Sequence, residues 1–210
     1  MPPNLSSPIF LLAHGEAPPR KLAHSLAKAA SAVLCTDGSY GTAVKLGLKP
    51  RWVIGDMDSL PEGQKVGKGT TLVLEDEQDT SDFEKAVKFL LKFGCDRAAV
   101  AGAEGKRMDH FLTALSVAVK YAAKIRLTFY TDTSVYELLT KGSQFKAKKG
   151  EVLSLIPVDN PSWVTLSGVK FPMTREPLFA GSRGQSNQAL GGKVRVDVHS
   201  GKVWLVRNCI

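Results

Sequence analysis

The stretch Trp-Val-Ile-Gly-Asp-Met-Asp-Ser at residues 52–59 joins a short apolar run to a glycine and two aspartates. Similar apolar runs alternate with helix-like stretches from Ile9 to about Thr131. Such alternation favours an α/β domain with a mostly parallel sheet and helices on both faces, which we assign to residues 1–135. The predicted strands are Ile9–Ala13, Ala32–Cys35, Trp52–Ile54, Thr71–Leu74, Ala98–Ala101 and Arg126–Tyr130, and the predicted helices are Lys21–Ala30, Thr42–Leu46, Asp82–Phe93 and His110–Tyr121.

The remainder of the chain has a different pattern, with short β-like runs and turns that contain Gly and Pro. After a bridging strand at Val135–Leu139 we expect a small antiparallel β domain over residues 141–210. The apolar alternation of its last two strands, on either side of residues 199–202, predicts a hairpin. The other strands predicted there are Glu151–Pro157 and Val164–Leu166, before Val194–Val198 and Lys202–Val206.

The composition narrows the setting and the partners. Three cysteines in 210 residues, far apart and without metal-type spacing, indicate reduced thiols in the cytoplasm. No apolar stretch approaches the ~20 residues of a membrane span, so we expect no membrane partner. A net charge of +8 suits an anionic ligand, but the scattered lysines lack the pattern of a nucleic-acid groove. We therefore expect no nucleic acid partner.

Asp and Gly gather directly after four of the predicted strands. The four segments are residues 36–39, 55–59, 75–82 and 102–110. Because ligands of open parallel sheets bind beyond the carboxyl ends of the strands, these segments are expected to form one site. Several carboxylates at one edge repel one another unless a cation joins them.

A hard divalent cation fits this acidic edge. Mg²⁺ prefers oxygen ligands and is usually shared between one or two carboxylates and substrate phosphates, which Asp56 and Asp58 can supply. Gly55 allows the backbone to approach a phosphate closely. Lys106 and Arg107 add positive charge that can clamp phosphate oxygens.

Two of the acidic loops also carry helix-capping patterns. Ser81 and Glu84 have the spacing of a capping box, which places Asp82 in the first turn of the following helix. Capping by Ser81 is compatible with a role in the site. Asp109 is either the N-cap of the next helix or a ligand of the site, and the residues alone leave both open.

The ordered set of segments resembles the thiamine pyrophosphokinase family. Asp37-Gly38, residues 50–59, residues 78–85 and residues 102–110 are similar to its four successive motifs, and residues 167–173 with Ser186-Asn187 are similar to signatures of its C-terminal domain. The resemblance implies a Rossmann-like nucleotide-binding catalytic domain and a β-sandwich-like domain for thiamine binding and dimerisation. It also implies a homodimer that binds thiamine where the subunits meet.

The resemblance implies a role for each matching position. It assigns Asp56, Asp58 and Asp82 to Mg²⁺ and Asp37, Arg107 and Asp109 to the binding of ATP. It places Gln78, Asp79 and Ser81 around the substrates, and Ser186 and Asn187 at the thiamine of the partner subunit. Gly38, Gly55, Ser59 and Lys106 complete the expected binding residues.

The chain departs from the family pattern at several positions. Glu77 replaces an Asp and Ser81 replaces a Thr, and both changes preserve the functional group. Lys106 replaces a glycine, which can alter how its loop closes on phosphate. Gly41 replaces an Asn and removes a possible side-chain contact to the nucleotide.

These observations predict a Mg²⁺-dependent transfer of the terminal diphosphate of ATP to the hydroxyl of thiamine, with AMP leaving. Asp79 is the candidate to orient or deprotonate that hydroxyl. The alternatives are a haloacid-dehalogenase-type phosphatase, a nucleotide-sugar transferase that uses Asp56 and Asp58 to hold Mn²⁺, and a nucleotide-binding module without turnover. ATP, Mg²⁺ and thiamine together separate these hypotheses, because the first alone forms AMP and thiamine diphosphate in equal amounts.

Overall fold

The computed structural model of the chain describes residues 6–60 and 66–208, so Cys209, one of the three cysteines, lies outside the described residues. The chain divides into two compact units, Met1–Asp132 and Thr133–Ile210. None of the helices in the described ranges is long and apolar enough to cross a membrane.

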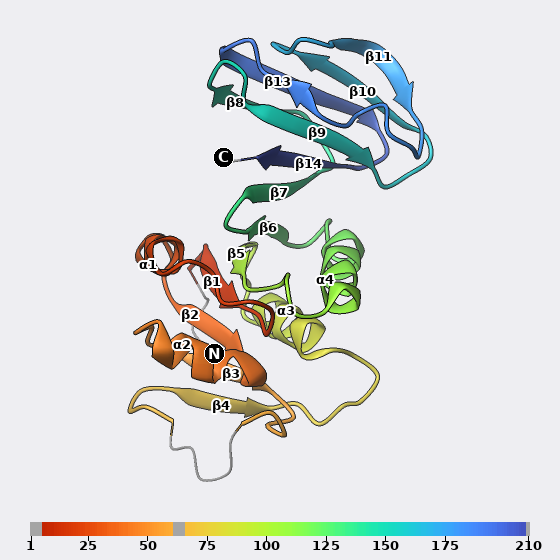
Figure 1. Ribbon diagram of the computed structural model, residues 1–210. Coiled ribbons are helices and arrows are strands. Elements are labelled where there is room, and N and C mark those ends of the chain that lie inside the picture. Colours follow the sequence, from red (N-terminus) through yellow and green to blue (C-terminus); the bar gives the residue numbers. More distant parts are fainter. Residues whose placement is uncertain (1–5, 61–65, 209–210) are drawn as a thin grey trace. The chain divides into compact units, whose positions relative to one another are not determined.

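Unit 1 is built on a parallel sheet with the strand order β6-β5-β1-β2-β3-β4 (Figure 1). Every neighbouring pair in this order is parallel, as predicted from the sequence. The central strand β1 is buried at all four positions, because helices cover both sides of the sheet. The strands are β1 Ile9–Leu12, β2 Val33–Thr36, β3 Trp52–Gly55, β4 Thr71–Leu74, β5 Arg97–Ala101 and β6 Arg126–Tyr130.

The helices of unit 1 pack in two groups, one on each face of the sheet. Side chains of α1 and α2 share a core with Phe10, Leu12 and Val53. On the opposite face, Phe89 of α3 contacts Trp52, and Phe111 of α4 lies edge-on against Phe129. The two-sided α/β fold predicted from the sequence is therefore confirmed. The helices are α1 Arg20–Ala29, α2 Tyr40–Lys45, α3 Asp82–Lys92 and α4 Met108–Lys120, with a short 3₁₀ turn η1 at Asp37–Ser39.

The starts of α3 and α4 decide the two capping predictions. Ser81 Oγ accepts a hydrogen bond of 3.3 Å from the Glu84 amide, so Ser81 caps α3 as predicted. The prediction that Asp109 could cap α4 is wrong, because α4 begins at Met108 and Arg107 occupies the cap position. Asp109 lies in the first turn instead, where a carboxylate is stabilised by the positive end of the helix.

Unit 2 consists of two antiparallel sheets. One has the order β12-β9-β14-β7 and the other β11-β10-β13-β8. Leu153 and Leu155 of the first sheet share a core with Val164 and Val194 of the second, so the two sheets pack face to face as a sandwich. The strands are β7 Ser134–Leu139, β8 Ser143–Ala147, β9 Val152–Pro157, β10 Ser162–Ser167, β11 Met173–Leu178, β12 Asn187–Gln188, β13 Gly192–Ser200 and β14 Val203–Asn208.

The predicted hairpin of the last two strands is wrong. β13 pairs with β10 and β8, whereas β14 pairs with β7 and β9 in the other sheet. Gly201, with φ +77°, reverses the chain between them, and Ser162 donates a hydrogen bond of 2.8 Å to the Lys202 carbonyl. The alternation of apolar residues correctly predicted two strands, but it carries no information on which strand each one pairs with.

Three strands of unit 2 were not predicted: β8 and β11, which are rich in polar residues, and β12, which has only two residues. β8 contributes only Phe145 and Ala147 to the apolar core. β11 lies at the edge of its sheet and contains Pro177, a residue that edge strands tolerate because one side needs no hydrogen-bond donor.

An ion pair in unit 2 predicts a pH-dependent stability. Arg207 donates from Nε and a terminal nitrogen to Glu151 Oε1, at 3.0 and 2.6 Å, and its guanidinium lies 4.1 Å from the Phe145 ring centroid. Burial acts to raise the pKa of Glu151, but the hydrogen bonds from Arg207 and the Lys148 amide outweigh it and leave the pKa below its usual 4.5. A lowered carboxyl pKa stabilises the fold above the unfolded-state value, and this stabilisation disappears as the pH falls through the folded-state value.

Replacing Glu151 by Gln is therefore expected to lower the free energy of unfolding by about 1–2 kcal/mol at pH 7. The difference from the wild type should vanish in acid, below the folded-state pKa of Glu151. Urea unfolding between pH 7 and pH 3 measures it. Glu176→Gln is the matched control, because its partner Arg183 is 57% exposed and such surface pairs contribute little. A pH-independent difference would contradict the prediction.

Candidate active site

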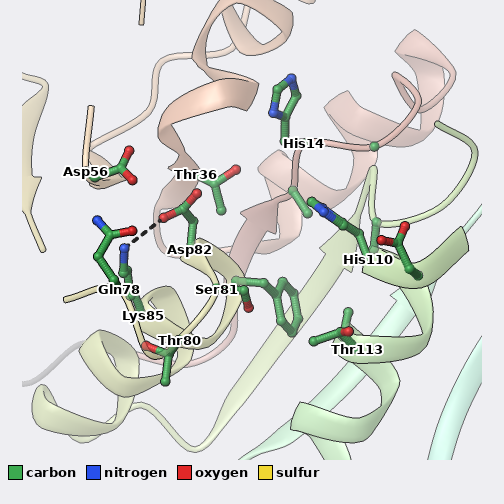
Figure 2. A pocket seen from close by; sticks show the side chains of 16 residues that line it. His14, Thr36, Asp56, Gln78, Thr80, Ser81, Asp82, Lys85, His110 and Thr113 are labelled. Atoms are coloured by element: carbon green, nitrogen blue, oxygen red, sulfur yellow. Dashed lines mark hydrogen bonds and ion pairs between the residues drawn. The ribbon is translucent and has the colours of Figure 1, made fainter. Parts of the chain in front are cut away.

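The candidate site lies at the carboxyl edge of the unit 1 sheet. β1 lies between β2 and β5. After β1 the chain adds β2, β3 and β4 on one side of it and then β5 and β6 on the other side. This reversal of strand order opens a crevice at the carboxyl ends of the strands in α/β sheets. A pocket of about 450 Å³ occupies this edge (Figure 2). Its lining comes from the ends of β1 to β5 and from α3 and α4: Ala13, His14, Gly15, Thr36, Asp56, Gln78, Thr80, Ser81, Asp82, Phe83, Lys85, Ala103, Asp109, His110, Thr113 and Ala114.

Asp37 lies outside the pocket lining, and its carboxylate joins the loop after β2 to the loop after β3. Its side chain is 2% exposed and accepts hydrogen bonds from the Gly38 amide at 2.6 Å and the Met57 amide at 3.1 Å. Burial raises the pKa of Asp37, and the negative charges of Asp82 and Asp56 raise it further, against the effect of the two hydrogen bonds. Met57 adopts φ +69°, a conformation uncommon for a residue with a side chain. Asp37 thus fixes the turn between Asp56 and Asp58.

The two aspartates of that turn differ in position. Asp56 lines the pocket, and its Oδ1 accepts a hydrogen bond of 3.1 Å from the Asp58 amide. Asp58 is exposed and does not belong to the pocket lining. This structure therefore presents one carboxylate of the pair to the pocket.

The loop before α3 is held by contacts at both of its ends. The Glu75 amide donates to the Gly55 carbonyl at 3.0 Å, and Glu77 accepts hydrogen bonds of 3.0 Å from both Lys88 and Thr80. These contacts bring Gln78 and Asp82 to the pocket, and Figure 2 shows both side chains pointing into it with Asp56.

The loops after β1 and β5 close the other side of the pocket. The Gly15 amide donates to the Gly102 carbonyl at 2.5 Å, and both loops contribute to the lining. Burial lowers the pKa of His14, and the positive charges of Lys106 and His110 lower it further. His14 is therefore neutral at neutral pH and can accept a hydrogen bond from a ligand.

Arg107 and Asp109 form a bidentate ion pair. Arg107 Nε donates to Asp109 Oδ1 at 3.1 Å, and a terminal nitrogen of Arg107 donates to the other oxygen. Hydrogen bonds from Arg107 lower the pKa of Asp109, although both side chains are more than 60% exposed. Asp109 reaches the pocket lining, whereas Arg107 and Lys106 do not. The pair uses two of the five N–H donors of Arg107, so a phosphate can bind the remaining donors or replace the carboxylate.

The structure thus brings together part of the predicted set. Asp56, Gln78, Ser81, Asp82 and Asp109 line one pocket. Asp37, Gly38 and Gly55 lie directly behind it through the contacts of Asp37. The other predicted residues of unit 1 lie outside the lining: Asp58, Ser59, Asp79, Lys106 and Arg107.

Sequence reasoning gave no role to several polar residues of the lining, and Lys85 is the most consequential of these. Its side chain is 4% exposed, and its Nζ lies 3.3 Å from Asp82 Oδ1. The signal was its spacing, since residues three apart on a helix share one face and Asp82 begins α3. The other residues in this group are His14, Thr36, Thr80, His110 and Thr113.

The predicted thiamine contacts belong to unit 2. Asn187 is 4% exposed, and its amide exchanges hydrogen bonds with the Phe171 backbone, donating at 2.6 Å and accepting at 3.1 Å. Ser186 is exposed, and its backbone amide donates to Ser154 Oγ at 3.0 Å. The Asn187 side chain therefore fixes the backbone at Phe171, a residue whose own side chain is 61% exposed.

Comparisons with known proteins agree with this architecture. Two family models match the chain: thiamin pyrophosphokinase, catalytic domain, over residues 23–129, and thiamin pyrophosphokinase, vitamin B1 binding domain, over residues 140–203. A search of curated proteins found no match.

Solved structures with a similar fold include thiamine pyrophosphokinases from bacteria and a yeast. The Bacillus subtilis enzyme is 20% identical to this chain and superposes with a TM-score of 0.81. The alignment covers 95% of this chain and 98% of the Bacillus subtilis chain. The Geobacillus thermodenitrificans enzyme is 21% identical with a TM-score of 0.82, covering 96% and 97%. The Candida albicans enzyme is 16% identical with a TM-score of 0.78, covering 95% and 89%.

Proposed function

The chain belongs to the thiamin pyrophosphokinase family, and from this premise we propose how its residues perform the reaction. Its activity is the transfer of diphosphate from ATP to the hydroxyl of thiamine, which yields thiamine diphosphate and AMP. The observation that carries this conclusion is the match of both the catalytic and the vitamin-binding models, in order along one chain. The phosphatase, sugar-transferase and non-catalytic alternatives are not favoured.

The acidic edge of unit 1 has the chemistry that Mg²⁺ requires. No group of three His, Cys, Asp or Glu side chains in residues 6–60 and 66–208 is arranged to hold a metal by itself. Asp56 and Asp82 nevertheless line one pocket, and their charges act together on Asp37. One or two carboxylates completed by substrate phosphates and water is the usual Mg²⁺ arrangement, so the residues fit.

We assign Asp56, Asp58 and Asp82 to the metal. Asp58 follows the turn that Asp37 fixes, and its backbone is tied to Asp56. When bound, Mg²⁺ neutralises phosphate oxygens as negative charge moves towards the leaving AMP. Little covalent work falls to the protein, which chiefly positions the substrates.

The other side chains of this edge are assigned to substrate binding. Gln78, Ser81 and Asp109 line the pocket and can bind the substrates there. Asp79, in the same loop as Gln78, is proposed to orient or deprotonate the thiamine hydroxyl. Arg107 is proposed to bind phosphate by exchanging its partner Asp109 for the nucleotide.

The assembly is also part of the proposal. We propose a homodimer in which residues 1–135 bind the nucleotide and residues 141–210 bind thiamine of the partner subunit through the segment at Ser186 and Asn187. Exposed apolar side chains in unit 2, at Phe171, Phe179 and Leu190, support a buried partner surface. A cytoplasmic location is proposed from the buried free thiols of Cys35 and Cys95.

The activity is tested by incubating the purified chain with ATP, Mg²⁺ and thiamine. AMP and thiamine diphosphate should appear in equal amounts, and both should be lost when thiamine is omitted or EDTA is added. Release of ADP, or of AMP without thiamine, would identify another reaction. Coupled detection of AMP and separation of thiamine diphosphate by chromatography give the two readings independently.

A further inference from the structure

Lys85 is a buried cation in the candidate active site. It lies in the first turns of α3, with a side chain only 4% exposed. Taking an ammonium group out of water is unfavourable unless a charge and hydrogen bonds compensate it. The partner is Asp82 Oδ1 at 3.3 Å, and Figure 2 marks this pair inside the pocket.

The pairing gives Asp82 two competing partners. Asp82 is a proposed ligand of Mg²⁺, yet in this structure one of its oxygens already accepts a hydrogen bond from an ammonium group. An ammonium that neutralises Asp82 also reduces its repulsion with Asp56, which lines the same pocket. A metal ion that binds Asp82 must therefore displace Lys85 from it or share the carboxylate with it.

The position of Lys85 in the pocket also allows its ammonium group to contact a bound phosphate. Among the described residues that line it, Lys85 is the one Lys or Arg, since Lys106 and Arg107 lie outside the lining. A polyphosphate bound there needs positive charge from the protein beside the metal. The four-carbon side chain of lysine is flexible, and its three donors suit phosphate oxygens.

We propose that Lys85 pairs with Asp82 before the nucleotide binds and then turns its ammonium group to a phosphate oxygen of ATP. This inference rests on the proposed metal role of Asp82. It makes Lys85 a residue that contacts the substrate, and it couples the binding of metal to the binding of nucleotide. Metal bound without nucleotide leaves the displaced ammonium without a partner, whereas metal and nucleotide together supply one.

The test compares two affinities in Lys85→Gln, with Mn²⁺ as the probe and free Mn²⁺ measured by electron paramagnetic resonance. Mn²⁺ alone should bind roughly threefold tighter than to the wild type, because a competing charge is gone. Mn²⁺ with α,β-methylene ATP should bind the variant about 10-fold more weakly, because one charged hydrogen bond is lost. A general loss of structure would weaken both.

Lys92→Gln is the matched control, since Lys92 is an exposed lysine in the last turn of the same helix and should leave both affinities unchanged. If Lys85→Gln does not fold, Lys85→Met gives the same comparison. Equal or weaker binding of Mn²⁺ alone in a folded Lys85 variant overturns the inference. If the wild type binds no Mn²⁺ even with the nucleotide analogue, the proposed metal site itself is wrong, which is a distinct result.

Discussion

Replacing Asp56 by Asn is expected to lower the rate of thiamine-dependent AMP formation by about 10²–10³-fold, the loss seen when one group that stabilises transition-state charge is removed. Asn has nearly the same shape, so the turn that Asp37 fixes should remain. The variant loses only the negative charge at the pocket. Initial rates over a range of Mg²⁺ concentrations measure the effect, and part of the loss should be recovered at high Mg²⁺.

Asp96→Asn is the matched control for this variant. Asp96 is 70% exposed and lies just before β5, at the end of that strand opposite the pocket, so the same loss of charge should leave turnover unchanged. Thermal unfolding shows whether both variants remain folded. Near wild-type turnover in a folded Asp56→Asn protein would falsify the assignment of Asp56 to the metal.

Gly55→Ala is expected to displace Asp37, which holds the turn at Asp56–Asp58, and to destabilise unit 1. A Cβ at this position would lie 2.7 and 2.8 Å from the two carboxylate oxygens of Asp37. Moving Asp37 would cost free energy, because its side chain is buried and accepts hydrogen bonds from two backbone amides. We expect a loss of about 1–3 kcal/mol in the free energy of unfolding, typical of overpacking, and a large fall in activity.

Gly41→Ala provides the comparison. Gly41 lies in α2 with no atom within 4 Å of an added Cβ, so alanine should leave activity unchanged and stabilise the helix by about 0.5–1 kcal/mol. Urea unfolding and initial rates of AMP formation read out both variants. Equal stability and activity in the two variants would show that the contact between Gly55 and Asp37 does not matter.

The central strands β1, β2 and β3 of unit 1 could be predicted because a buried parallel strand is a continuous apolar run, and β4 and β6, although less buried, are also rich in apolar residues. β6 has the predicted bounds, and β2 differs by one residue at each end. In unit 2 the strands have one solvent-exposed face and mixed composition, so β8 and β11 were not predicted, and the two-residue β12 is too short to form a recognisable pattern. Alternation there correctly indicated β13 and β14, but the pairing partner depends on contacts between residues far apart in the chain.

For the site, the sequence predicted which loops meet but not which side chains turn inward. The shared edge of a parallel sheet is a property of topology, and so the loops after β2 to β5 could be expected together. Whether Asp56 or Asp58 faces the pocket depends on the turn at Met57, which a hydrogen bond from outside the motif fixes. Lys85 lies in the segment 78–85 that resembles a family motif, but it was given no role, because its burial and its contact with Asp82 depend on the packing of α3.

The separation of β13 and β14 into different sheets has a consequence for the order in which the protein is made. β14 lies between β7 and β9 and pairs Val203 with both Leu139 and Pro157, so that sheet cannot close until β14 has been synthesised. Strands that are far apart in the sequence pair slowly. Until they pair, the edges of the strands already formed remain without hydrogen-bond partners. Unit 1 has all its strands by Tyr130 and can begin folding on the ribosome while the sandwich still waits for its middle strand.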